Sequence, residues 1–236
     1  FYLMEDKSYF ERLEEARQYS KEKIVNEYPW IFDIRGYINW YFTHTTDSLQ
    51  HSVIDGANMQ YQALLLGSFM RTHYVLYELI LLSSNIEAAT LARKQIELIS
   101  RIKELDTKDV DTLSKKTPNI KHSRHFNRDY GILSEIAHSS SLDSLDVMGF
   151  KMVDESHKMF YMQPTYTGDT IELLRLWLAL FVEFIFCSMD IKASIIPEYD
   201  ASWDIKFSLR LFRYGKDNDI MLLKGIYESL DEKTDS

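Results

Sequence analysis

The chain is poor in residues that cross-link, bend or interrupt a polypeptide. Its 236 residues include one cysteine, four prolines and eight glycines. A lone cysteine excludes an intrachain disulfide framework and a cysteine-rich zinc site. This residue, Cys187, follows an apolar run and is predicted to be a buried thiol rather than a nucleophile. Scarce proline and glycine, with apolar residues recurring every three or four positions, indicate long helices.

Long apolar runs without charges are also missing. The most apolar stretch, residues 171–196, contains five charged side chains. A membrane span of about 20 residues tolerates few such charges, so this stretch predicts a buried core helix. Residues 1–27 are highly charged and lack the apolar core of a signal peptide. We therefore expect a cytoplasmic protein with no membrane partner.

Motifs of common catalytic and nucleotide-binding sites are absent from the sequence. There is no GxGxxG, Walker A, HExxH or CxxC motif. His122 and His125 are three residues apart, but the surrounding run contains no acidic ligand, which disfavours a metal ion there. We expect neither a cofactor nor a metal centre.

The pattern that remains predicts an all-α bundle of seven or eight helices. The expected helices span about 6–27, 34–51, 57–83, 86–105, 123–139, 169–196, 201–212 and 218–230. A small irregular or β-hairpin insert is expected around residues 149–164. We predict a single helical domain over residues 1–236, with a disordered tail from about 231 to 236.

Two of the expected helices carry a polar pair on one face. Arg93 and Glu97 are four residues apart on one helix, and Ser134 and His138 are four apart on another. Structural roles explain both pairs, because Arg–Glu pairs brace bundles and the helix dipole favours histidine at a C-terminus. The alternative is a catalytic site, in which His138 is an acid or base and Arg93 stabilises developing phosphate charge.

One basic segment stands out in this acidic protein of net charge −9. No acid occurs between residues 115 and 128, which include Lys115, Lys116, Lys121, Arg124 and Arg128. The segment precedes an expected helix, and a helix N-terminus with nearby cations binds anions. It is a candidate site for phosphate, a nucleotide or an RNA backbone. The alternative is a solvated loop whose charges offset acidic neighbours.

Residues 89–98 have the sequence ATLARKQIEL, and residues 130–139 have the sequence YGILSEIAHS. These two segments resemble helices of uncharacterised bacterial helical proteins that are distantly similar to the HEPN superfamily. The resemblance covers about residues 64–140 and implies a helical protein related to RNA-cleaving toxins and phage-defence proteins. HEPN ribonucleases carry an arginine followed by histidine four to six positions later, and no arginine here has a histidine at that spacing.

These observations favour binding over catalysis. We expect a non-catalytic binding module, acting in bacterial defence or stress response, that engages RNA or another phosphate-bearing ligand through the basic segment. One alternative is a HEPN-like ribonuclease or phosphodiesterase that uses His138. Another is a protein-interaction scaffold or homodimer, built on the aromatic helix around Trp40. Catalysis is disfavoured because no acid is placed to orient a Ser134–His138 pair.

Overall fold

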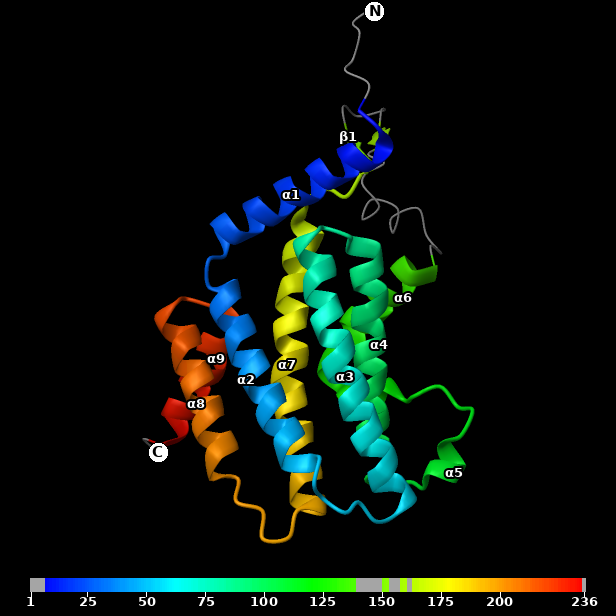
Figure 1. Cartoon of the computed structure of the whole chain (residues 1–236), viewed down its shortest axis with the longest axis vertical. Coiled ribbons are helices and arrows are strands. Elements are labelled where there is room, and N and C mark those ends of the chain that lie inside the picture. The colour runs from blue at the N-terminus through cyan, green and yellow to red at the C-terminus, as the bar shows by residue number, and fades with distance from the viewer. Residues whose placement is uncertain (1–6, 139–149, 153–157, 161–162, 235–236) are drawn as a thin grey trace, which may run out of the picture. The chain divides into compact units, whose positions relative to one another are not determined.

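The computed structural model describes residues 7–138, 150–152, 158–160 and 163–234, except for the side chains of Arg124 and of residues 150–152, 158–160 and 231–234. The fold is an all-α helical bundle (Figure 1), as the sequence predicts. In these residues the α-helices are Tyr9–Glu27 (α1), Ile31–Leu49 (α2), Ala57–Leu81 (α3), Asn85–Glu104 (α4), Val110–Leu113 (α5), Asn127–His138 (α6), Gly168–Ile195 (α7), Ser202–Asp217 (α8) and Met221–Thr234 (α9). A 3₁₀ helix, Ile120–Phe126, precedes α6.

Local signals set the helix ends. α1 begins with a capping box, in which the Glu11 N–H donates to Ser8 Oγ and the Ser8 N–H donates to the Glu11 carboxylate. Between α3 and α4 the chain reverses at Ser83, whose φ is 50°. α4 begins at Asn85, one residue before the start expected from the sequence.

The largest differences from prediction lie in polar stretches. The helix expected over residues 123–139 begins within the 3₁₀ helix and is α-helical only from Asn127. The backbone of Ser123, inside the 3₁₀ helix, leaves helical values with φ −122° and ψ 56°. The short α5 lies within a stretch expected to be irregular. α9 continues to Thr234, into the segment predicted as a disordered tail, while residues 235–236 lie outside the described residues.

Contacts divide the chain into two compact units. The first contains residues 1–29, 71–96 and 123–177. In its core, His73 and Trp177 are buried and stack with ring centroids 5.4 Å apart and an interplanar angle of 10°. α3, α4 and α7 contribute residues to both units. The single domain therefore stays a prediction.

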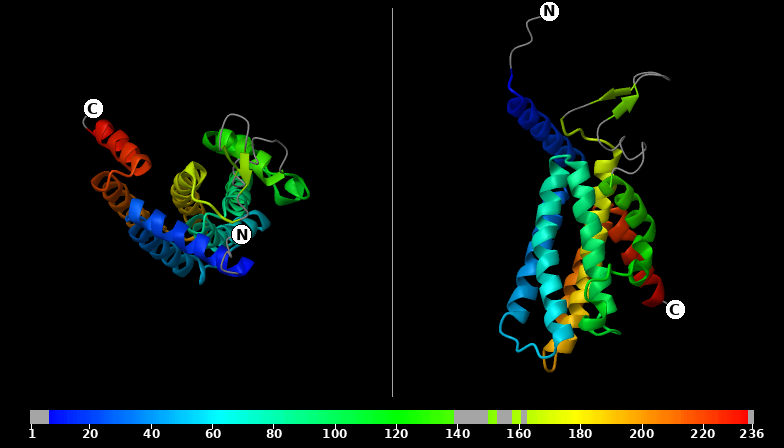
Figure 2. Two further views of the ribbon diagram at one scale, coloured as in Figure 1. Left: turned by 90° about the horizontal axis from the view of Figure 1, so that it is seen from above. Right: turned by 90° about the vertical axis from the view of Figure 1, so that its right-hand side faces the viewer.

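The second unit contains residues 30–70, 97–122 and 178–236. Its aromatic core includes the fully buried ring of Tyr41, which lies 4.8 Å from that of Phe207. α8 packs against α9 (Figures 1 and 2), and this approach requires glycine at position 215. A Cβ atom on Gly215 would lie 2.1 Å from Leu223 Cβ.

A short hairpin belongs to the first unit. Strands β1 (Phe150–Met152) and β2 (Lys158–Phe160) pair antiparallel, with Phe150 opposite Phe160 (Figure 2). Both strands lie within the insert predicted at residues 149–164.

Candidate functional site

Arg93, Tyr130 and His138 form a polar cluster in the first unit. α4 carries Arg93, and α6 carries Tyr130 and His138 about two turns apart. Arg93 Nη1 lies 2.9 Å from His138 Nε2, and Nη2 donates to the Tyr130 hydroxyl at 3.4 Å. The guanidinium also lies over the Tyr130 ring, 5.3 Å from its centroid. Because His138 is exposed, this cluster reaches the surface of the unit.

The contact with Arg93 involves one ring nitrogen of His138. A guanidinium only donates hydrogen bonds, so Nε2 of the imidazole is the acceptor in this contact. The other ring nitrogen, Nδ1, makes no hydrogen bond to a described residue.

The other two residues predicted for this site are placed differently. Glu97 is half-buried one turn further along α4 and belongs to the second unit. Ser134 is half-buried one turn before His138 on α6. In the described part of the chain, no hydrogen bond joins the Ser134 and His138 side chains. The structure thus brings Arg93 to His138 but forms no Ser–His pair.

The predicted basic segment is divided between the two units. Lys115, Lys116 and Lys121 belong to the second unit, are exposed, and make no ion pair with any described residue. Arg128 belongs to the first unit and lines a groove of about 330 Å³ together with three carboxylates. Carboxylates therefore lie beside Arg128, whereas none of the described acidic side chains forms an ion pair with the three lysines. The side chain of Arg124 lies outside the described residues.

A second polar cluster, which the sequence did not predict, is buried in the second unit. Lys192 Nζ donates to Asp204 Oδ1 at 2.7 Å, and these residues are 0% and 1% exposed. The Tyr41 hydroxyl donates to the same Oδ1 at 2.7 Å, and the Tyr199 hydroxyl donates to Oδ2 at 2.6 Å. Tyr41 also lies 2.8 Å from Ser188 Oγ. The cluster joins α2, α7 and α8.

The hydrogen bonds of this cluster decide its charge state. Burial acts to raise the pKa of Asp204, but the bonds from Lys192, Tyr199 and Tyr41 outweigh it and hold the pKa below its usual value. Burial lowers the pKa of Lys192 against the opposing effect of Asp204. Burial and the bond to Asp204 raise the pKa of Tyr41, so its hydroxyl stays protonated. Each charge is compensated within the same unit, as in a structural brace.

A signal for this brace was present in the sequence. Lys192 lies in the most apolar stretch of the chain, and a buried lysine requires an acidic partner. Asp204 lies three and seven residues before Phe207 and Leu211, on the buried face of α8. The pairing itself depends on the chain reversal between α7 and α8, which neither helical pattern predicts.

Other groups with chemical capacity are enclosed or dispersed. Cys187 is buried, as predicted, and burial raises the pKa of its thiol to about 12, so the thiol is protonated at neutral pH. Within the described ranges, no three His, Cys, Asp or Glu side chains are grouped to hold a metal ion. None of the helices in those ranges combines the length and apolar character that a membrane span needs.

Comparisons with family models, curated proteins and solved structures found no match to this chain. The similarity to HEPN proteins therefore stays a prediction.

Proposed function

We propose that the protein is a non-catalytic binding module that engages the phosphate backbone of a nucleic acid through Lys115, Lys116 and Lys121. One observation carries this proposal. These three lysines lie within one short segment without an acid, are exposed, and make no ion pair with a described residue, although the protein has a net charge of −9. Uncompensated lysines bind phosphates as point charges and require no base-specific geometry.

The backbone of this segment is held in place. Arg101 is 5% exposed, lies 3.1 Å from the Glu104 carboxylate, and donates a hydrogen bond to the carbonyl of Lys116. Leu113, two residues before Lys115, is buried. At the other end, Asn119 Oδ1 accepts from the Lys121 N–H at 3.2 Å. Anchoring of this kind lowers the conformational entropy lost on binding.

Salt dependence tests the proposal directly. Each lysine that neutralises a phosphate of a single strand contributes about 0.7 to the slope of log K against log salt concentration. Replacing Lys115, Lys116 and Lys121 together by alanine should therefore reduce the slope by about 2, and affinity at 0.1 M salt by about 100-fold. Fluorescence anisotropy with a labelled single-stranded RNA at several salt concentrations measures both quantities.

A second triple variant serves as the matched control. Lys21, Lys206 and Arg213 are exposed cations that also make no ion pair with a described residue, and their replacement by alanine removes the same charge. The control should retain most of the affinity and of the salt slope. Equal losses in the two triple variants, or no salt-dependent binding by the unmodified protein, would refute the proposal.

Phosphodiester cleavage is a second candidate, favoured by the 2.9 Å contact between Arg93 and His138. Nε2 of His138 is engaged by Arg93, so Nδ1 is the atom available to transfer a proton, while Arg93 supplies charge for a phosphate. Cleavage predicts RNA fragments on a denaturing gel that disappear with His138→Ala and persist with His51→Ala, a change at another exposed histidine. Intact RNA after prolonged incubation would eliminate this candidate.

A further inference from the structure

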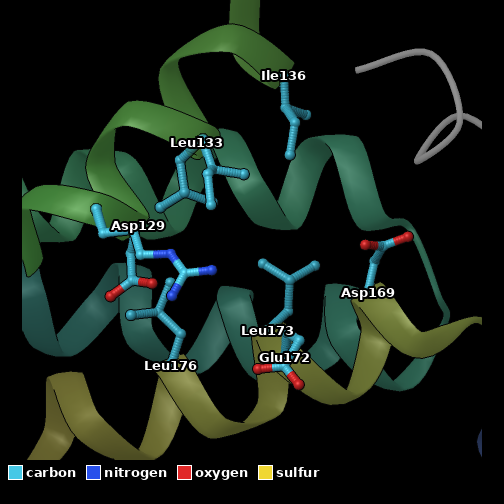
Figure 3. A pocket seen from close by; sticks show the side chains of 9 residues that line it. Asp129, Leu133, Ile136, Asp169, Glu172, Leu173 and Leu176 are labelled. Atoms are coloured by element: carbon cyan, nitrogen blue, oxygen red, sulfur yellow. The ribbon is translucent and has the colours of Figure 1, made fainter. Parts of the chain in front are cut away.

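The groove between α6 and the start of α7 has a largely aliphatic lining (Figure 3). Leu133 and Ile136 from α6 face Leu173 from α7, and Leu176 and Ile132 complete the apolar lining. Leu133, Ile136 and Leu173 are buried, whereas Ile132 is 49% exposed at the rim. The volume, about 330 Å³, lies at the lower end of the range of small-ligand sites.

The charged side chains of the groove are mostly acidic. Three carboxylates, those of Asp129, Asp169 and Glu172, line it with the single guanidinium of Arg128. Burial raises the pKa of Asp129, and the negative charge of Glu172 adds to this rise against the charge of Arg128. Glu172 Oε1 already accepts a hydrogen bond from Arg175 Nη1 at 2.6 Å, so Asp129 and Asp169 are the carboxylates that remain for a cationic ligand.

The carboxylates are distributed along the groove. Asp129 and Leu176 lie at one end, Ile136 and Leu173 lie near the middle, and Asp169 lies at the other end (Figure 3). Asp169 and Leu176 are seven residues apart on α7, which corresponds to about 10 Å of helix. Aliphatic side chains occupy the distance between the two ends. No three of the described acids are grouped to coordinate one metal ion, so the arrangement suits separated charges on one flexible chain.

We infer that this groove binds a linear aliphatic diamine or polyamine, with one ammonium group at Asp129, another at Asp169, and methylene groups against Leu133 and Leu173. An extended chain of about 10 Å matches the length of α7 between the two ends. The methylene groups bury against leucine side chains, which favours an alkyl chain over a compact hydrated cation. This site lies in the first unit and goes beyond the proposed phosphate site, which lies in the second.

Isothermal titration calorimetry with 1,8-diaminooctane and spermidine tests the inference on the full chain. Asp129→Asn and Asp169→Asn should each weaken binding about tenfold, and the double variant about 100-fold, because each change removes one ammonium partner. The neutral analogue 1,8-octanediol should not bind. Asp217→Asn, which removes an exposed charge on α8 in the second unit, should leave the affinity unchanged.

Three results would overturn the inference. The first is the absence of any heat of binding with either amine at millimolar concentration. The second is an equal loss of affinity in Asp217→Asn and Asp169→Asn, because that indicates general electrostatic attraction. The third is equal binding of 1,8-octanediol, because the carboxylates would then have no role. None of these outcomes bears on RNA affinity, so this inference and the proposed function fail independently.

Discussion

Mild acid should weaken the first unit through a single buried side chain, His73. The ring is 1% exposed, its Nδ1 lies 2.9 Å from the Gln95 side-chain oxygen, and it stacks on Trp177. Burial lowers the pKa of His73 from 6.5 to about 4, against the opposing effect of the Gln95 bond. The folded protein therefore keeps this ring neutral at a pH where the unfolded chain protonates it.

The size of the effect follows from the two pKa values. Above pH 6.5 the ring is neutral in both states, and His73 makes no contribution to the pH dependence of folding. As the pH falls from 6.5 towards about 4, only the unfolded chain gains the proton, so the folded state loses relative stability. Each pH unit removes about 1.4 kcal/mol from the free energy of unfolding. The loss from His73 is about 2 kcal/mol at pH 5 and about 3 kcal/mol at pH 4.

Urea unfolding at pH 7, 6 and 5, followed by circular dichroism, measures this loss. His73→Asn keeps a donor near the position of Nδ1 but cannot titrate. Between pH 7 and pH 5, the free energy of unfolding of this variant should therefore fall by about 2 kcal/mol less than that of the unmodified protein. His51→Asn, a change at an exposed histidine, should keep the original pH dependence. If His73→Asn and the unmodified protein lose the same stability between pH 7 and pH 5, the reasoning about burial is wrong.

Two further predictions concern the second unit. Asp204→Asn should destabilise the protein by about 3–5 kcal/mol, because it leaves the buried Lys192 charge without its partner, and adding Lys192→Met should recover part of that loss in urea unfolding. A double variant less stable than Asp204→Asn alone would contradict this account. Gly215→Ala should lower the free energy of unfolding by about 1–3 kcal/mol, because the new Cβ meets Leu223. Gly225→Ala on α9 places its Cβ in open space and should raise the free energy of unfolding by about 0.5–1 kcal/mol. Similar melting temperatures for the two alanine variants would show that α8 and α9 separate easily.

The long helices could be predicted because their apolar spacing and their breaks are both local. Chain reversals near Ser83 and Pro197 separate stretches whose apolar residues recur at helical spacing, and both boundaries were found within a few residues. The four-residue α5 and the 3₁₀ turn before α6 were not predicted as separate elements, because such short pieces contain too few apolar positions to show a period.

The candidate sites were only partly predictable, for a different physical reason. Spacing within each helix identified Arg93 on α4 and His138 on α6 as polar positions. Their contact joins residues 45 apart in sequence and depends on how α4 meets α6. The basic segment was visible in the sequence. The carboxylates beside Arg128 were not, because residues of α6 and α7 come together only in the folded chain. The groove itself has no sequence signal, because its leucines have the same spacing as ordinary core residues.

The two buried polar groups change their contributions to folding stability over separate pH ranges, because one is buried as a neutral group and the other as a charged group. His73 is stable only as the neutral ring, so its contribution falls from pH 6.5 downward. Asp204 is stable only as the carboxylate bonded to Lys192, and its pKa lies below the usual value of 3.8. Its contribution is therefore complete above the unfolded pKa and is lost only as the pH falls below it. Between pH 6.5 and about 4 the core around His73 weakens while the Lys192–Asp204 brace persists, so mild acid destabilises the protein through His73 and not through the brace.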